Sequence, residues 1–263
     1  MDALPVALAI VAILAAGEEP SSAGPKAASP GATAPAASAP AAAAASPQPD
    51  KEPVAALIRR SMAAYGGERA QVRLGCVKAA GKITSPLHPG QVGRYTRVFS
   101  RSSRLRQEIA FPGSSPEVRV LDGARAFRYG EPAPAPVAAT LQLQAARLGL
   151  PALLLEWEPR VVDQGEVTHE GQKLRVLGLE IGTGTRVEAG IDPRSGRILY
   201  VRGLARAGPR ELELFTVYHD FRVVDGVLVA FQEEGWANGE PTGEVELNGV
   251  EFPEDVPESA FEP

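Results

Sequence analysis

The chain has few residues that could form a catalytic centre or a metal site. Its three histidines, His88, His169 and His219, are far apart and show no HxxxH or HExxH spacing, so the sequence gives no support for a zinc site. His219-Asp220 could form an acid–base pair or half a metal site, but we interpret His219 as a strand residue beside an acid that faces the turn. His88 is expected in a loop.

Motifs for nucleophilic catalysis and phosphate binding are missing from the sequence. It contains no G-x-S-x-G elbow, no Walker loop and no G-x-G-x-x-G. The segment 182–184 (GTG) reads as a hairpin turn, because no helix is expected to follow it. Cys76 is the single cysteine and has no histidine near it in the sequence, so we interpret it as a buried, inert side chain. We therefore expect a protein that is not an enzyme and needs no cofactor or metal.

Charged side chains gather in acidic and basic groups. Glu233-Glu234 and the run 251–255 lack the spacing of a calcium loop, so we expect them on a solvated face. The basic group crowds the early strand candidates and comprises Arg97, Arg101, Arg104, Arg106, Arg119, Arg125 and Arg128. These arginines could form ion pairs on the outer face of a sheet. Alternatively they form a positive rim that contacts anionic lipid head groups or an acidic partner.

Strands separated by regular turns account for most of the chain after residue 70. They are expected at 72–84, 92–99, 105–111, 117–121, 124–129, 161–163, 167–169, 172–181, 185–191, 198–204, 211–223, 227–236 and 244–252. Asp225-Gly226 and Asn238-Gly239 predict two-residue hairpin turns, and Asn248-Gly249 shifts the alternation and predicts a β-bulge. The strand 211–223 is apolar on both faces, so both should be covered. So many strands predict one strongly curved antiparallel sheet.

Two helical regions accompany the strands. Apolar residues recur at helical spacing from Val54 to Met62, with Pro53 in the first turn and Gly66 as the C-terminal cap. The leucine-rich insert 137–157 is divided at Pro151, which predicts two short helices packed inside or across the sheet. Such an arrangement leaves a cavity between helix and sheet for an apolar ligand.

Composition defines the remaining organisation. The 263 residues carry a formal net charge of −5, which argues against a nucleic-acid partner. Residues 1–17 resemble a signal peptide or short anchor, 18–50 form an Ala/Pro/Ser-rich linker expected to be disordered, and 51–263 form one β domain. We therefore expect export to the periplasm or cell envelope of a Gram-negative-type bacterium.

Several short motifs occur in an order that is similar to a known family. They read AYGG at 64–67, RLRQEI at 104–109, IDPRSGRI at 191–198, YHDFRVVDGVLVAF at 218–231 and GEVELN at 243–248, with a terminal Phe261. Together they resemble outer-membrane lipoprotein-sorting proteins of the lipoprotein-carrier (LolA/LolB-like) superfamily. The resemblance implies an unclosed β-barrel with a helical lid, whose apolar interior accepts acyl chains in the periplasm without a cofactor. It also implies that Arg106 contacts the lid, although simple alternation places Arg106 opposite Leu105 and Ile109.

These expectations define a candidate ligand site. The apolar cavity candidates are Leu105, Ile109, Leu141, Leu148, Leu153, Leu154, Phe215, Val217, Phe221 and Phe231. Arg106 and Arg104 are the candidates for contact with the lid or a lipid head group. The sequence predicts a monomeric binding or carrier protein for lipid acyl chains or lipid-modified proteins, with a membrane surface as a further contact. The alternative is a non-catalytic structural or protein-interaction module of the cell envelope with a filled core.

Overall fold

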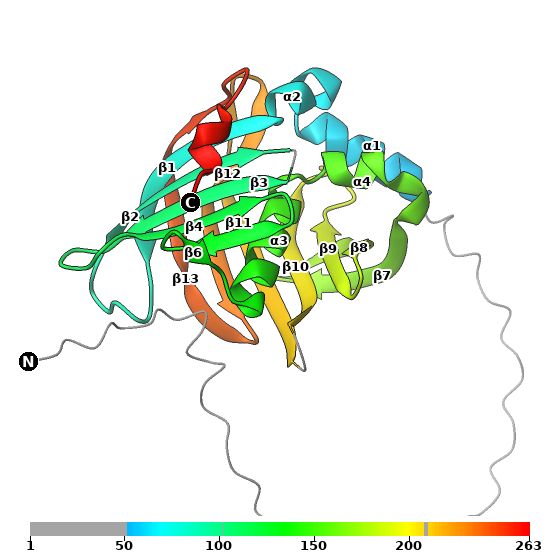
Figure 1. Ribbon diagram of the computed structural model, residues 1–263. Coiled ribbons are helices and arrows are strands. Elements are labelled where there is room, and N and C mark those ends of the chain that lie inside the picture. The colour runs from blue at the N-terminus through cyan, green and yellow to red at the C-terminus, as the bar shows by residue number, and fades with distance from the viewer. Residues whose placement is uncertain (1–51, 102, 208–209) are drawn as a thin grey trace, which may run out of the picture.

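The computed structural model describes residues 52–101, 103–207 and 210–263, and the expected signal segment and linker lie outside the described residues. Within these ranges, thirteen strands form one antiparallel sheet (Figure 1). The strands are β1 Cys76–Thr84, β2 Gly93–Ser100, β3 Arg104–Ala110, β4 Glu117–Asp122, β5 Arg125–Arg128, β6 Glu131–Pro132, β7 Val162–His169, β8 Gln172–Gly182, β9 Thr185–Ile191, β10 Ile198–Ala207, β11 Arg210–Val224, β12 Val227–Ala237 and β13 Glu240–Glu251. The predicted fold class, a strongly curved antiparallel sheet, is confirmed.

The order of the strands leaves the barrel open. It runs β6-β5-β4-β3-β2-β1-β13-β12-β11-β10-β9-β8-β7, so two meanders meet where β1 pairs with β13, and β6 and β7 are the two edges. The chain between these edges is the helical insert, with α3 at Ala135–Leu148, α4 at Ala152–Glu156 and a 3₁₀ turn, η2, at Glu158–Arg160. The insert must therefore run from one edge of the open sheet to the other.

Local turn chemistry sets the hairpins. Asp225-Gly226 and Asn238-Gly239 both have positive φ at each residue, as a type I′ turn requires, and they connect β11 to β12 and β12 to β13. The predicted bulge is also present: Ala80 pairs with Gly249 and Gly81 with Leu247, which leaves Asn248 without an opposite residue. The sequence therefore determined these strand registers locally.

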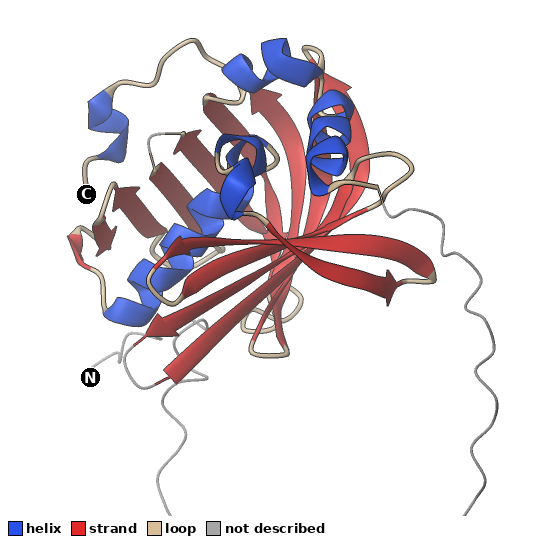
Figure 2. Ribbon diagram, turned by 90° about the vertical axis from the view of Figure 1, so that its right-hand side faces the viewer, coloured by secondary structure: helices blue, strands red, loops and turns tan. Residues whose placement is uncertain are grey.

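The helices lie on the concave side of the sheet. Figure 2 shows α1 (Val54–Ala64) and the insert within the curve of the strands, and α2 (Gly67–Arg73) at the upper rim. From α1, Leu57 and Ile58 are fully buried against inner-face residues of β8 to β10, and Leu143 of α3 joins the same core. No helix among the described residues is long and apolar enough to cross a membrane. The core is therefore a helical layer enclosed by a sheet.

The expected strand at 72–84 begins too early, and the expected strands 161–163 and 167–169 are a single strand, β7. Residues 67–73 form α2 rather than the start of a strand, and β1 begins at Cys76. Gly66 and Gly67 both have positive φ, so the chain ends α1 and then enters a second helical turn. Val72, expected at the start of the strand, is 81% exposed.

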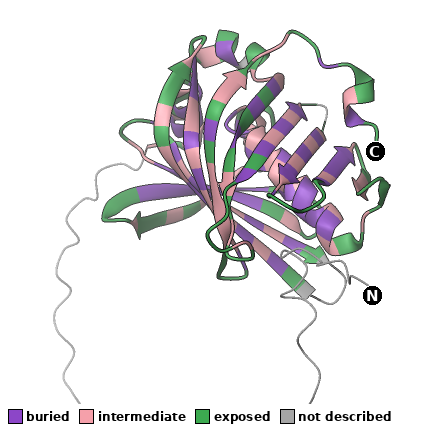
Figure 3. Ribbon diagram, turned by 90° about the vertical axis from the view of Figure 1, so that its left-hand side faces the viewer, coloured by how far each residue is buried: buried purple, intermediate pink, exposed green. Residues whose placement is uncertain are grey.

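The outer face of the sheet carries its own apolar clusters. Figure 3 shows buried and partly buried residues alternating along the strands near the C-terminal turn. That turn, η3 (Glu258–Phe261), places Phe261 on the outer face beside Val120, where both side chains are buried. A second outer cluster includes Val217 of β11, while Leu212 and Leu214 of that strand join the inner core. Strand β11 is therefore covered on both faces from Leu212 to Val217, as predicted, but Val223 near its end is 69% exposed.

Candidate ligand-binding site

Strand β2 presents a polar-to-apolar series of side chains to the concave side. Tyr95, Arg97 and Phe99 are two residues apart and are all buried. Because alternate residues of a strand share a face and lie roughly 7 Å apart, these three side chains follow one another along the interior. An arginine between two aromatic residues on a buried face needs a counter-ion, because an unpaired buried charge is unfavourable.

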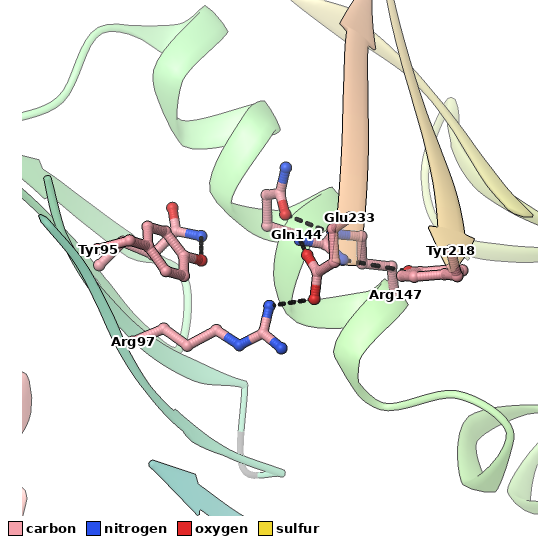
Figure 4. Close-up of polar contacts among 7 residues, drawn as sticks. Tyr95, Arg97, Gln144, Arg147, Tyr218 and Glu233 are labelled. Carbon is pink, nitrogen blue, oxygen red and sulfur yellow. Dashed lines mark hydrogen bonds and ion pairs between the residues drawn. The ribbon is translucent and has the colours of Figure 1, made fainter. Parts of the chain in front are cut away.

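Glu233 of β12 provides that counter-ion (Figure 4). Its Oε1 accepts from Nη1 of Arg97 at 2.6 Å, and its Oε2 accepts from Nη2 of Arg147, on α3, at 2.8 Å. Arg147 also donates to the hydroxyl of Tyr218 and to the side-chain carbonyl of Gln144. This group, here named the interior ion network (Arg97, Arg147 and Glu233), joins the helical insert to strands on both halves of the sheet.

The network is almost entirely shielded from solvent. The side chains of Arg97 and Glu233 are each 5% exposed. Burial alone would raise the pKa of Glu233, but attraction by Arg147 and Arg97 and their hydrogen bonds lower it from 4.5 to about 2. The same pairing raises the pKa of both arginines despite their burial. All three groups are therefore charged at neutral pH.

Two small cavities lie on opposite sides of the network. An apolar cavity of about 90 Å³ includes Phe99, Leu148, Val201 and Val229 in its wall. A second cavity, of about 110 Å³, has a mixed wall. Its polar part is formed by Tyr95, Gln107, Arg119, Gln144 and Thr216, and its apolar part by Ile83, Ile109, Phe111 and Val245; for its polar part it is here named the polar cavity. Arg147 and Glu233 belong to the walls of both. The interior thus has an apolar end and a polar end with a fixed charge network between them.

A larger groove lies beside the insert. It has a volume of about 680 Å³ and runs between α3, α4, the β2–β3 and β4–β5 turns and the β8–β9 turn. Its apolar wall is formed by Phe99, Leu121, Ala146, Leu153, Trp157 and Ile181. Phe99 also belongs to the apolar cavity, so the groove and that cavity share a wall. The volume falls within the range of about 300–1,000 Å³ typical of small-ligand sites.

The ten predicted cavity residues are distributed over several places. Leu148 lines the apolar cavity, Ile109 the polar cavity and Leu153 the groove. The other seven pack elsewhere. Leu105, Leu141 and Leu154 are fully buried in the core, and Phe231 packs with Ile109 on the inner face. Phe215 and Val217 face outward, and the ring of Phe221 lies under Arg197. Side chains alternate between the two faces along β11, so Leu214 and Tyr218 point to the interior and Phe215 and Val217 point outward.

Arg104 and Arg106 do not contact the insert. Arg106 donates to the backbone carbonyl of Glu262, and Arg104 forms ion pairs with Asp122 and Glu258. Both lie on the outer face of β3, under the C-terminal segment. The expected lid contact is corrected accordingly: β3 has no bulge that would turn Arg106 inward, so strand alternation decides its side.

The interior ion network was not predicted from the sequence. Glu233 was expected on a solvated face, and Arg97 and Arg119 belonged to a group interpreted as outer-face or rim residues, yet all three are buried. The sequence held a local signal for burial: Arg97 is two residues from Tyr95 and from Phe99, so it shares a strand face with both aromatic side chains. In the same way Glu233 shares a face with the buried Phe231.

The other chemically capable residues have structural roles. His219 faces Glu234 rather than Asp220, and Asp220 pairs with Arg222. His88 lies in the β1–β2 loop and stacks on Phe111 with ring centroids 3.9 Å apart. Cys76 is half-buried, not fully buried as expected, and packs at the margin of the outer cluster under η3. Within the described residues no three His, Cys, Asp or Glu side chains are grouped to hold a metal ion.

An open antiparallel sheet wrapped around a helical insert defines the structural class of this protein. A LolA superfamily protein from Nitrosomonas europaea is similar in structure with a TM-score of 0.50 and 14% identity, over 79% of this chain and 96% of that chain. A putative outer membrane lipoprotein-sorting protein domain from Vibrio parahaemolyticus matches with a TM-score of 0.44 and 12% identity, over 79% and 95%. No protein-family model and no curated protein match the sequence. The chain has a LolA-like fold, as its sequence motifs predicted.

Proposed function

We propose that this protein binds the acyl chains of a lipid or of a lipid-modified protein, in the periplasm and without catalysis. The observation that carries the proposal is the groove of about 680 Å³ beside α3 and α4. Its apolar wall, with Leu121, Leu153, Trp157 and Ile181, offers burial to a hydrocarbon chain, which is favourable by about 0.8 kcal/mol for each CH₂ group. The LolA-like fold supports this assignment.

In this proposal the helical insert is the lid over the interior of the sheet. It links the two open edges of the sheet, and the apolar cavity of about 90 Å³ beneath it is too small for a chain in this conformation. A chain that enters the groove reaches this cavity only if the C-terminal part of α3 moves. That movement separates Arg147 from Glu233, so the interior ion network stabilises the closed arrangement.

Filling the groove tests the proposal. Ala146 lines it on α3, and Ala146→Trp should lower uptake of a fluorescent fatty acid at least tenfold. Ala138 is on the same helix, is also partly exposed, and has no part in the groove wall, so Ala138→Trp is the matched control. Mass spectrometry of the full chain purified from a Gram-negative host should find co-purified lipid. A wild-type chain that carries no lipid and takes up no fatty acid contradicts the proposal.

The second candidate is a protein-interaction module with a filled core. The observation that favours it is the small size of both interior cavities, about 90 and 110 Å³, well under the roughly 300 Å³ of an ordinary small-ligand site. In that case the edge strands β6 and β7 are the surfaces for a partner strand. The fatty-acid measurement separates the candidates, because a filled core gives no uptake in either Ala146→Trp or wild type.

A further inference from the structure

A row of basic residues crosses the inner face of the sheet next to the polar cavity. Arg97 on β2 is directly opposite Gln107 on β3, Gln107 is opposite Arg119 on β4, and Arg119 is opposite Arg128 on β5. Directly opposed residues share a face, so their side chains form one continuous row. Like charges at opposed positions are unfavourable, and Arg119 with Arg128 is such a pair.

The acidic partners do not balance this row. Glu117 accepts with Oε1 from Nε of Arg119 at 2.8 Å and from Nε of Arg128 at 2.7 Å. With the interior ion network, four guanidinium groups therefore face two carboxylates among the described residues. Three of these guanidinium groups are buried and Arg128 is 13% exposed, so two positive charges are in excess at this face of a chain whose net charge is −5. Arginine does not release its proton, so this excess charge is solvated by water or compensated by a bound anion.

Residues with hydrogen-bond donors come from three elements and line the polar cavity. Arg119, on β4, is bound by its Nε to Glu117, which leaves its two terminal nitrogens as donors. Gln144, on α3, uses its carbonyl oxygen for Arg147 and so keeps its NH₂ group. Tyr95, on β2, accepts from Gln107 and keeps its hydroxyl proton. Glu234 also lines the cavity, but its carboxylate faces His219.

We propose that the polar cavity binds an anionic phosphate or carboxylate group, with Arg119 as its main ligand. We further infer that this anionic group is the head group of the bound amphiphile, and this part of the inference rests on the proposed function. The order along β2 supports that pairing: Tyr95 lines the polar cavity, Arg97 belongs to the network, and Phe99 lines the apolar cavity and the groove. A volume of about 110 Å³ has room for several waters or one tetrahedral anion.

Calorimetric titration of the full chain with three probes tests this assignment. Decyl phosphate and 1-decanol have the same chain and differ in the head group, and inorganic phosphate has no chain. Wild type should bind decyl phosphate at least tenfold more tightly than decanol. Arg119→Gln should weaken decyl phosphate binding about tenfold, the scale of one charge-assisted hydrogen bond, and leave decanol unchanged. Arg94→Gln is the control, because Arg94 is on β2 but its side chain is 69% exposed.

The outcomes separate the anion site from the proposed function. Equal affinity for decyl phosphate and decanol in wild type overturns the anion site and leaves acyl-chain binding in place. Binding of inorganic phosphate without binding of either amphiphile supports an anion site for a free anion and overturns the proposed function. No binding of any probe overturns both. The wild-type comparison needs no variant, so the test is decisive even if Arg119→Gln does not fold. Arg119→Lys, which keeps the charge, should still bind decyl phosphate more tightly than 1-decanol.

Discussion

Replacing Glu233 by glutamine tests the interior ion network. The substitution keeps the size of the side chain but leaves Arg97 and Arg147 buried without their shared counter-ion. Breaking a buried ion pair from one side typically costs about 3–5 kcal/mol of unfolding free energy. The pKa of Glu233 gives a second value for the same loss: a fall from 4.5 to about 2 corresponds to about 3 kcal/mol of unfolding free energy. We expect Glu233→Gln to lose about 3 kcal/mol at pH 7.

The pH dependence follows from the direction of that shift. The folded-state pKa of Glu233 is lower than its unfolded value of 4.5, so the carboxylate stabilises the fold fully at pH values above 4.5. Its contribution is lost as the pH falls from 4.5 toward about 2, where Glu233 becomes protonated in the folded state. The difference in stability between wild type and Glu233→Gln should therefore shrink over this interval.

Guanidinium chloride unfolding, followed by circular dichroism at pH 7 and at several values down to pH 2.5, measures this difference. Glu234→Gln is the matched control, because its carboxylate is the next residue on β12, is 37% exposed and faces His219. We expect it to change stability by less than about 0.5 kcal/mol. A loss below about 1 kcal/mol for Glu233→Gln at pH 7, or an unchanged difference between pH 7 and 2.5, would refute the reasoning.

Four further substitutions test the packing. Phe261→Ala should cost about 3–5 kcal/mol of unfolding free energy, because Phe261 is 3% exposed in the outer cluster; a loss below about 1 kcal/mol would mean that the C-terminal turn is not docked. Gly81→Ala should cost about 1–3 kcal/mol, because a Cβ there lies 2.2 Å from the backbone oxygen of Glu246. Gly249→Ala, in the same bulge, meets nothing within 4 Å and should change stability by under about 0.5 kcal/mol; equal effects would contradict the bulge geometry. Leu141→Ala should cost about 2–5 kcal/mol in thermal unfolding, since Leu141 fixes α3 in the core, and a neutral result would show that α3 is not packed there.

Features that depend on neighbouring residues were predictable. The type I′ turns require positive φ at two successive positions, which Asp225-Gly226 and Asn238-Gly239 provide without help from the rest of the chain. The bulge at Asn248 was visible as a break in alternation, and the doubly apolar strand 211–223 required cover on both faces. The strand start at residue 72 was predicted wrongly, because Gly66 and Gly67, both with positive φ, end α1 and also lead into α2.

The candidate site was less predictable, because its residues come from distant parts of the chain. Arg97 and Glu233 are 136 residues apart, and Arg147 and Glu233 are 86 apart. Alternation states which residues share a face, but it does not say which face is enclosed. That is why Phe215 and Val217 were assigned to the interior although they face outward.

The sequence by itself determined the antiparallel strands, the hairpin turns and the apolar helical insert, since these follow from side-chain period and backbone preference over a few residues. Only the tertiary structure decided which side of the sheet the insert occupies. Pairing of β1 with β13 brings the two meanders together, and the connection from β6 to β7 then passes through the concave side. Because the insert passes there, that face becomes the interior, and Arg97, Arg119 and Glu233 are buried on it. Arg104 and Arg106 remain on the outer face. Strand alternation alone does not decide which face is enclosed, whereas long-range packing does.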